Sequence, residues 1–168
     1  MKIVVLKFGG TSVGTIEKIK KVTDIIIEHK KKKNKVIVVS SAMSGVTNDL
    51  IKKSKQISNN FIDSEYDVLV SSGEQVACSL IAGRLNHKGF KSRSWLGWQI
   101  PIFTTGPYTN SRIQKVNKNK LLRFLKEGGI PIVTGFQGVN MSERITTIGR
   151  GGSDASAIMI AKFFKAQR

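Results

Sequence analysis

Two glycine-rich loops carry the side chains best suited to chemistry. The first reads Lys-Phe-Gly-Gly-Thr-Ser, from Lys7 to Ser12, and follows a short apolar run. Paired glycines let a backbone approach a ligand and direct N–H groups at it, and Lys7 adds a full positive charge. A helical pattern follows, so the positive end of a helix lies close by. The loop lacks both standard nucleotide-binding spacings, so these features fit a phosphate-binding loop or an ordinary strand-to-helix turn about equally.

The second loop spans residues 146–157 and reads T-T-I-G-R-G-G-S-D-A-S-A. Its Arg150 lies among three glycines, and an arginine can bind a carboxylate or phosphate through two parallel hydrogen bonds. Ser153 and Asp154 open a helical pattern, where Ser153 is predicted to be the N-cap and the helix dipole stabilises the carboxylate of Asp154. This loop predicts an anion-binding site in which Ser153 and Asp154 also cap the helix.

The elements that must position these loops alternate between strands and helices. Short apolar runs predict buried strands, and apolar residues recurring at helical spacing predict helices. Such alternation predicts an α/β fold in which a mostly parallel sheet is sandwiched by helices. The predicted strands are 2–6, 36–39 and 130–133, with extended segments at 90–95 and 99–104 and a hairpin arm at 139–147; the predicted helices are 15–32, 46–57, 73–87, 117–127 and 153–165, and 58–65 is predicted to be irregular.

Ligands of parallel sheets bind outside the carboxyl ends of the strands. Polar, glycine-rich loops follow Leu6, Val39 and Val133, and a fourth loop occupies 149–153. We therefore expect these loops to converge on one site.

Composition limits the class of protein. A chain of 168 residues with 40% hydrophobic residues has room for one domain with a core, and no apolar run reaches the length of a membrane span. The apolar start is followed at once by Lys7 without a small-residue cleavage site, which favours a strand over a signal peptide. The single cysteine, Cys78, has no internal disulfide partner and is expected in the core, so a cytoplasmic protein is the simplest interpretation.

The chain is strongly basic, with 28 Lys and Arg against 11 Asp and Glu and a net charge of +17. Such a charge can indicate a nucleic-acid-binding module, which would bind in a salt-sensitive manner. However, the one dense run, Lys30 to Lys33, closes a predicted helix, where cations are favourable. Aromatic residues are sparse and not interleaved with the basic ones. A lysine-rich composition on solvated faces is the favoured interpretation, with a basic nucleic-acid-binding module as the alternative outside enzymes.

Five motifs together resemble aspartate kinases, within the wider amino-acid kinase superfamily. They span nearly the whole chain in the order found in that family, and the first and last are specific to it. Another amino-acid kinase, of the acetylglutamate, glutamate 5-kinase, uridylate or carbamate type, would share the fold but not this pair. The motifs are K-F-G-G-T-S at 7–12, S-G-V-T-N at 44–48, S-S-G-E at 71–74, G-F-Q-G at 135–138 and G-R-G-G-S-D at 149–154.

The resemblance implies a carbamate kinase-like fold and an activity. Aspartate kinases transfer the terminal phosphoryl group of ATP to the side-chain carboxylate of L-aspartate, the first step toward lysine, threonine and methionine. Mg²⁺ would arrive with the ATP, and no dedicated protein cage for a metal is predicted. The implied partners are L-aspartate and ATP, with no specific nucleic acid and no membrane; a complementing downstream segment or a homo-oligomer is also allowed.

The resemblance also implies the roles of the residues in the first loop. Lys7 matches the lysine that contacts the transferring phosphoryl group, so it is a predicted catalytic residue. Gly9 and Gly10 match backbone donors at the same place. Thr11 and Ser12 complete the predicted phosphate-binding loop.

Four other residues match substrate-binding positions of the family. Thr47 and Glu74 are two of them, with Glu74 suited to pair with the substrate ammonium. Arg150 matches the residue that binds the α-carboxylate, and Ser153 lies beside it. Asp154 matches the acidic residue that orients Lys7, and it is the second predicted catalytic residue.

Compared with the family pattern, residues 1–168 correspond to the amino-terminal part of the catalytic domain. The motifs of the ATP-binding half and the regulatory domains lie outside this sequence. We therefore expect the chain alone to lack normal kinase activity, because half of an ATP site cannot position the nucleotide. We also expect its last helix to expose apolar side chains, namely Ile158, Met159, Ile160, Phe163 and Phe164.

Overall fold

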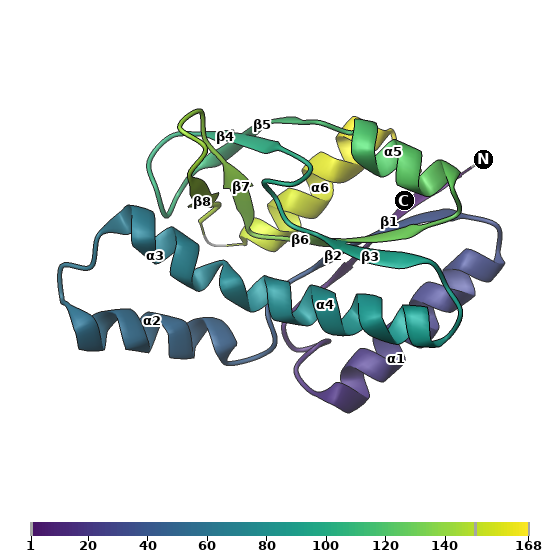
Figure 1. Cartoon of the computed structure of the whole chain (residues 1–168), viewed down its shortest axis with the longest axis horizontal. Coiled ribbons are helices and arrows are strands. Elements are labelled where there is room, and N and C mark those ends of the chain that lie inside the picture. Colours follow the sequence, from purple (N-terminus) through teal and green to yellow (C-terminus); the bar gives the residue numbers. More distant parts are fainter. Residues whose placement is uncertain (1, 150, 168) are drawn as a thin grey trace.

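The computed structural model describes residues 2–149 and 151–167. Helices and strands alternate over most of the chain, and the two kinds of element form stacked layers (Figure 1). The elements are β1 (Ile3–Phe8), α1 (Ile16–Lys31), β2 (Lys35–Ser40), α2 (Val46–Ile57), α3 (Asp63–Val70), α4 (Ser72–His87), β3 (Ser92–Trp95), β4 (Ile102–Thr105), β5 (Arg112–Val116), α5 (Asn119–Lys126), β6 (Ile130–Thr134), β7 (Gln137–Val139), β8 (Ile145–Thr147) and α6 (Gly152–Phe164).

The main sheet consists of four parallel strands in the order β1-β2-β6-β3. Helices cover both faces, so residues 36–39 of β2 and 130–133 of β6 are apolar and buried. Alternate residues of β2 enter two separate cores: Val36 and Val38 pack with α1 and α4, whereas Ile37 and Val39 pack with α5 and α6. The predicted α/β fold with a helix-covered parallel sheet is confirmed.

A second four-stranded sheet, in the order β5-β4-β7-β8, was not predicted as a separate layer. Its outer pairs are antiparallel, and β4 runs parallel to β7. The predicted extended segment 99–104 overlaps β4, and the predicted hairpin arm 139–147 covers β8 and the end of β7. A side chain at Gly138 would collide with Thr104, so glycine permits this close pairing.

The prediction that residues 58–65 are irregular is wrong at its end, because α3 begins at Asp63. This short helix has only a weak amphipathic pattern, and isolated helices of such length are marginal in water. Its stability therefore depends on tertiary contacts with the second sheet.

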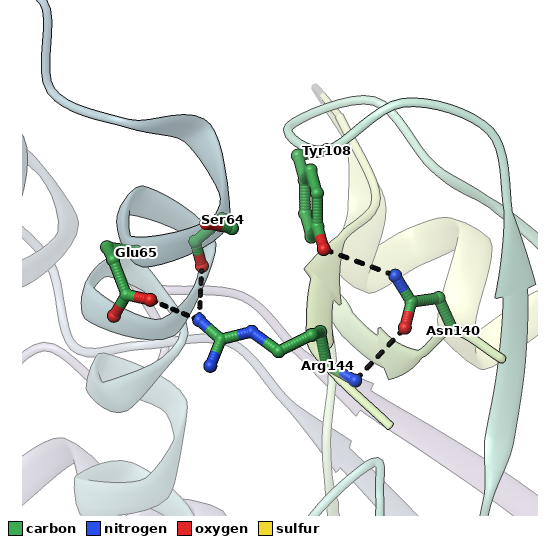
Figure 2. Close-up of polar contacts among 5 residues, drawn as sticks. All are labelled: Ser64, Glu65, Tyr108, Asn140 and Arg144. Atoms are coloured by element: carbon green, nitrogen blue, oxygen red, sulfur yellow. Dashed lines mark hydrogen bonds and ion pairs between the residues drawn. The ribbon is translucent and has the colours of Figure 1, made fainter. Parts of the chain in front are cut away.

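Part of that contact is a polar network between α3 and the β7–β8 hairpin (Figure 2). The Arg144 guanidinium donates to the Ser64 carbonyl at 3.4 Å and pairs with the carboxylate of Glu65. The Asn140 side chain accepts from the Arg144 backbone N–H at 3.0 Å and donates to the Tyr108 hydroxyl at 3.4 Å. The loop before β5, the hairpin and α3 are thus joined through side chains.

The apolar face of α6 is covered more fully than predicted. Ile160 and Phe164 are buried in the core between α5, α6 and the main sheet, so their predicted exposure is wrong. Ile158 is 67% exposed, as expected. Across the described residues, no helix combines the length and the apolar character that crossing a membrane would require.

Candidate active site

A cavity of about 720 Å³ opens where the parallel strands end. The end of β1 contributes Lys7 and the loop after it Gly10, and the loop after β2 contributes residues 41–45. The glycine-rich loop before α6 contributes Gly149 and Gly151, and the first turn of α6 contributes residues 152–154. The loops that the sequence predicts to converge therefore line one cavity.

Lys7 and Asp154 meet at this cavity from opposite ends of the chain. The Lys7 Nζ lies 2.9 Å from Asp154 Oδ1, and the two side chains are 27% and 64% exposed. Because the pair faces solvent, its net contribution to stability is small. The ion pair fixes the direction of the Lys7 ammonium. Glycine at position 9 leaves space for this ammonium, since a Cβ on residue 9 would lie 3.3 Å from Nζ.

Ser153 is held close to the end of β6 by a glycine. A Cβ at Gly135 would lie 2.8 Å from Ser153 Oγ, so a larger residue would push α6 away from the sheet. The predicted role of Ser153 as N-cap is wrong, because Gly151 is the N-cap, with a left-handed φ of 76°. Ser153 lies instead in the first turn of α6, where it lines the cavity.

The N-termini of α2 and α6 both open toward the cavity. Each helix follows a glycine in the left-handed conformation, Gly45 and Gly151, and in the part of the chain that the structure describes neither carries a side-chain cap. Thr47 and Ser153 lie in the first turns and line the cavity. Uncapped helix N-termini favour negative charge, so the cavity can receive anions at two points. For α2, sequence analysis did not predict this feature.

Glu74 supplies a buried carboxylate to the same cavity. Its Oε1 accepts the backbone N–H of Ala42 at 3.0 Å, and its Oε2 is buried without a hydrogen-bond partner among the described residues. Burial raises the pKa of Glu74 to about 7, although the hydrogen bond from the Ala42 N–H lowers it in part. A buried carboxylate oxygen with no partner is suited to accept from a cationic ligand group.

This pKa gives a testable dependence of stability on pH. The folded chain holds the Glu74 proton up to about pH 7, whereas the unfolded chain releases it near the ordinary value of 4.5. The stabilisation that this proton gives to the folded chain is therefore fully present below pH 4.5. Roughly 3 kcal/mol of unfolding free energy is lost as the pH rises to about 7. Glu74→Gln should flatten this part of the profile in urea unfolding at pH 5 and pH 8. The exposed Glu17→Gln variant is the control, and an unchanged profile in Glu74→Gln would contradict the assignment.

A second buried carboxylate, Asp67 of α3, orders another part of the cavity wall. Its Oδ1 and Oδ2 accept the backbone N–H of Thr109 at 3.1 and 3.0 Å. Its Oδ2 also accepts the N–H of Thr147 at 2.8 Å, and its Oδ1 accepts the Thr147 hydroxyl at 2.6 Å. Thr109, which has a left-handed φ of 64°, and Thr147 both line the cavity. Sequence analysis missed Asp67, because no local motif marks it.

The remaining predicted residues lie as follows. Thr11 and Ser12 line a separate shallow hollow beside α1, and the Ser12 backbone N–H donates to the Gly9 carbonyl at 2.9 Å. That N–H is therefore already engaged within the loop. Arg150 lies outside the residues that the structure describes.

Among the described residues, neither a reactive cysteine nor a metal-binding cluster adds to the candidate active site. Cys78 is fully buried in the core between α1, α4 and the sheet, and burial raises the pKa of its thiol. It is a packing residue, as predicted, since a buried thiol stays protonated. Within the described ranges, no three His, Cys, Asp or Glu side chains lie together as a metal site would need.

Comparison with known proteins gives consistent matches over the whole chain. A sequence model of the amino acid kinase family matches residues 2–168. The chain is 48% identical over 168 residues to an aspartokinase of Geobacillus stearothermophilus, and the match covers 100% of the chain and 41% of that protein. It is 46% identical over 171 residues to an aspartokinase of Rickettsia conorii, covering 100% of the chain and 43% of that protein. The chain thus spans less than half the length of these relatives.

Solved structures of aspartate kinases also match over nearly the whole chain. An aspartate kinase from Synechocystis matches with a TM-score of 0.83 and 39% identity, covering 99% of this chain and 27% of that one. E. coli aspartokinase III in complex with aspartate and ADP matches with a TM-score of 0.86 over 100% of this chain and 48% of that one. Its 24% identity shows a shared fold.

Proposed function

This chain belongs to the amino acid kinase family, and we propose that it forms the aspartate-binding part of an aspartate kinase. The reaction would transfer the terminal phosphoryl group of ATP to the side-chain carboxylate of L-aspartate, giving 4-phospho-L-aspartate and ADP. The observation that carries the proposal is one cavity with two kinds of charge: the buried, unpartnered carboxylate oxygen of Glu74 and the Lys7–Asp154 pair both line it.

An amino acid fits that arrangement of charges. The Oε2 of Glu74 would accept from the substrate ammonium, which also favours the ionised carboxylate at neutral pH. Thr47, Ser153 and the N-terminus of α6 would hold the α-carboxylate together with Arg150. The side-chain carboxylate of aspartate is already ionised at neutral pH, so the attack on phosphorus needs no strong general base.

The residues from Lys7 to Ser12 would bind the phosphoryl group that is transferred. Lys7, oriented by Asp154, would neutralise charge on the transferring group, and phosphoryl transfer depends mainly on such positioning and neutralisation. Gly9 and Gly10 would add backbone donors, with Thr11 and Ser12 as the outer part of the loop. ATP would be the donor, and Mg²⁺ would enter with it as part of the nucleotide substrate.

The experiment measures ATP-dependent aspartyl phosphate, trapped as the hydroxamate. It compares the 168-residue chain with a fusion of this chain to the remaining residues of the Geobacillus stearothermophilus aspartokinase. Because the 168 residues match 41% of that relative, we expect the fusion to be active and the chain alone to form no hydroxamate.

The substrate and the control make the result specific. The fusion should use L-aspartate and not L-glutamate or N-acetyl-L-glutamate, and the relative's remaining residues alone should be inactive. A folded fusion that is inactive, or that prefers another acceptor, would refute the proposal. Activity of the 168-residue chain alone would refute the expectation about its dependence on further residues.

A further inference from the structure

A second cavity, of about 500 Å³, lies between α5 and β3, the edge strand of the main sheet, and shares no lining residue with the candidate active site. Its volume is in the range of small-molecule sites. Its lining is mainly aromatic and cationic, with Arg93, Trp95, Trp98, Lys120, Arg123 and Phe124 as the main contributors.

Of the aromatic residues in the lining, Trp98 offers a face on which a planar ring can stack. Trp95 and Phe124 meet edge to face, with ring centroids 5.8 Å apart, and both pack on the core beneath α5. Trp98 lines the same cavity but is 48% exposed. A half-exposed indole at the mouth of a cavity offers a face for stacking that the chain itself does not cover.

The lining of the cavity carries more positive than negative charge. Its one acidic lining residue, Glu127, is held by Lys91 at 2.7 Å. Within the described part of the chain, no carboxylate lies within 4.0 Å of the guanidinium of Arg93 or Arg123. Lys91 and, more weakly, Arg123 lower the pKa of Glu127, so this carboxylate partly neutralises Arg123. Among residues 2–149 and 151–167, Arg93 has no such neighbour, and a guanidinium in this setting is suited to a phosphate or carboxylate.

Arg93 and Trp95 are in direct contact. The Arg93 guanidinium lies over the Trp95 ring, 4.2 Å from its centroid. Beneath it, the Trp95 Nε1–H is buried with no acceptor among the described residues, which is unusual for a buried indole. A ligand acceptor that reached this N–H would relieve an unfavourable feature of the free chain.

We propose that this cavity is a second ligand site, for a small anion that carries a planar ring, of the nucleoside monophosphate type. The arginines bind the anionic group, and the half-exposed Trp98 stacks on the ring. The site is independent of the proposed phosphoryl transfer, since the two cavities have separate linings.

The two tryptophans of the chain both line this cavity, so their indole N–H resonances report on it alone. The experiment titrates the ¹⁵N-labelled chain with adenosine 5′-monophosphate. Both indole signals should shift in a saturable manner, and adenosine or inorganic phosphate alone should bind more weakly. Losing one charge-assisted contact costs about 1.5–3 kcal/mol, so Arg93→Ala and Arg123→Ala should each weaken binding by roughly 10-fold or more.

Arg112→Ala, at an exposed arginine of β5, is the matched control and should bind normally. Lys7→Ala removes the cation of the other cavity and should leave the shifts intact. The proposal is overturned if the indole signals do not move, or if Lys7→Ala abolishes the shifts while Arg93→Ala and Arg123→Ala keep them. Shifts with an oligothymidylate but none with the mononucleotide would also overturn it.

Discussion

Replacing Lys7 with alanine is expected to lower the turnover of aspartyl phosphate formation by about 10²- to 10³-fold, the usual effect of removing one preorganised charge at a reacting centre. The Lys7 ammonium is aimed by Asp154 at 2.9 Å, and both residues line the cavity. Because the ammonium would act on charge in the transition state, the loss should fall on kcat and leave the KM for aspartate little changed. The hydroxamate assay on the fusion protein, with aspartate varied, separates the two constants.

Lys31→Ala is the control, since Lys31 is an exposed lysine in the last turn of α1, away from this cavity. Asp154→Asn should give a smaller loss than Lys7→Ala, because it removes only the group that orients the lysine. A rise in the KM for aspartate at unchanged kcat in Lys7→Ala would assign Lys7 to substrate binding and contradict the proposed role.

Replacing Asp67 with alanine is expected to reduce the free energy of unfolding by about 4 kcal/mol, because it leaves buried donors without an acceptor. Asp67 is fully buried, and its carboxylate accepts from both Thr109 and Thr147. Small domains have only about 5–15 kcal/mol of stability, so the loss should appear as a large fall in the urea midpoint.

Asp63→Ala tests the same substitution one turn earlier on α3, at an exposed position, and should have little effect. Asp67→Asn keeps the shape of the side chain and should lose less stability. In the fusion, where it still folds, Asp67→Asn should raise the KM for aspartate more than it lowers kcat, because Thr109 and Thr147 line the cavity. Equal stability of Asp67→Ala and Asp63→Ala would contradict the role of Asp67.

The sequence was sufficient for the main sheet and for much of the site. Strands β1, β2 and β6 are short apolar runs between polar loops, and that pattern alone predicts a buried parallel sheet with its ligand at the carboxyl ends. Because loops at the carboxyl ends of the strands converge, the sequence also predicts that Lys7 and Asp154 lie close together, and the structure has them in contact. The resemblance to aspartate kinases added the roles that spacing alone could not supply.

What the sequence could not supply depends on contacts between distant segments. The strand β5 reads Arg-Ile-Gln-Lys-Val and has too little apolar alternation to predict its pairing with β4. The short helix α3 lacks a strong amphipathic pattern, so its existence follows from partners in the hairpin (Figure 2). The prediction that Ser153 is the N-cap of α6 is wrong, because Gly151, in the left-handed conformation, takes that position two residues earlier.

The hydrogen bonds of Asp67 also bear on how the chain folds. They join α3 to strand β8, whose partner Thr147 lies 80 residues further along the chain. Contacts between such distant segments form slowly, since a long loop must close before they contribute. The parallel sheet of β1 and β2 can assemble from nearby segments, whereas this wall of the cavity must wait until β8 has docked. The ligand site is therefore expected to be completed late in folding, and to be the first part to open when the chain is destabilised.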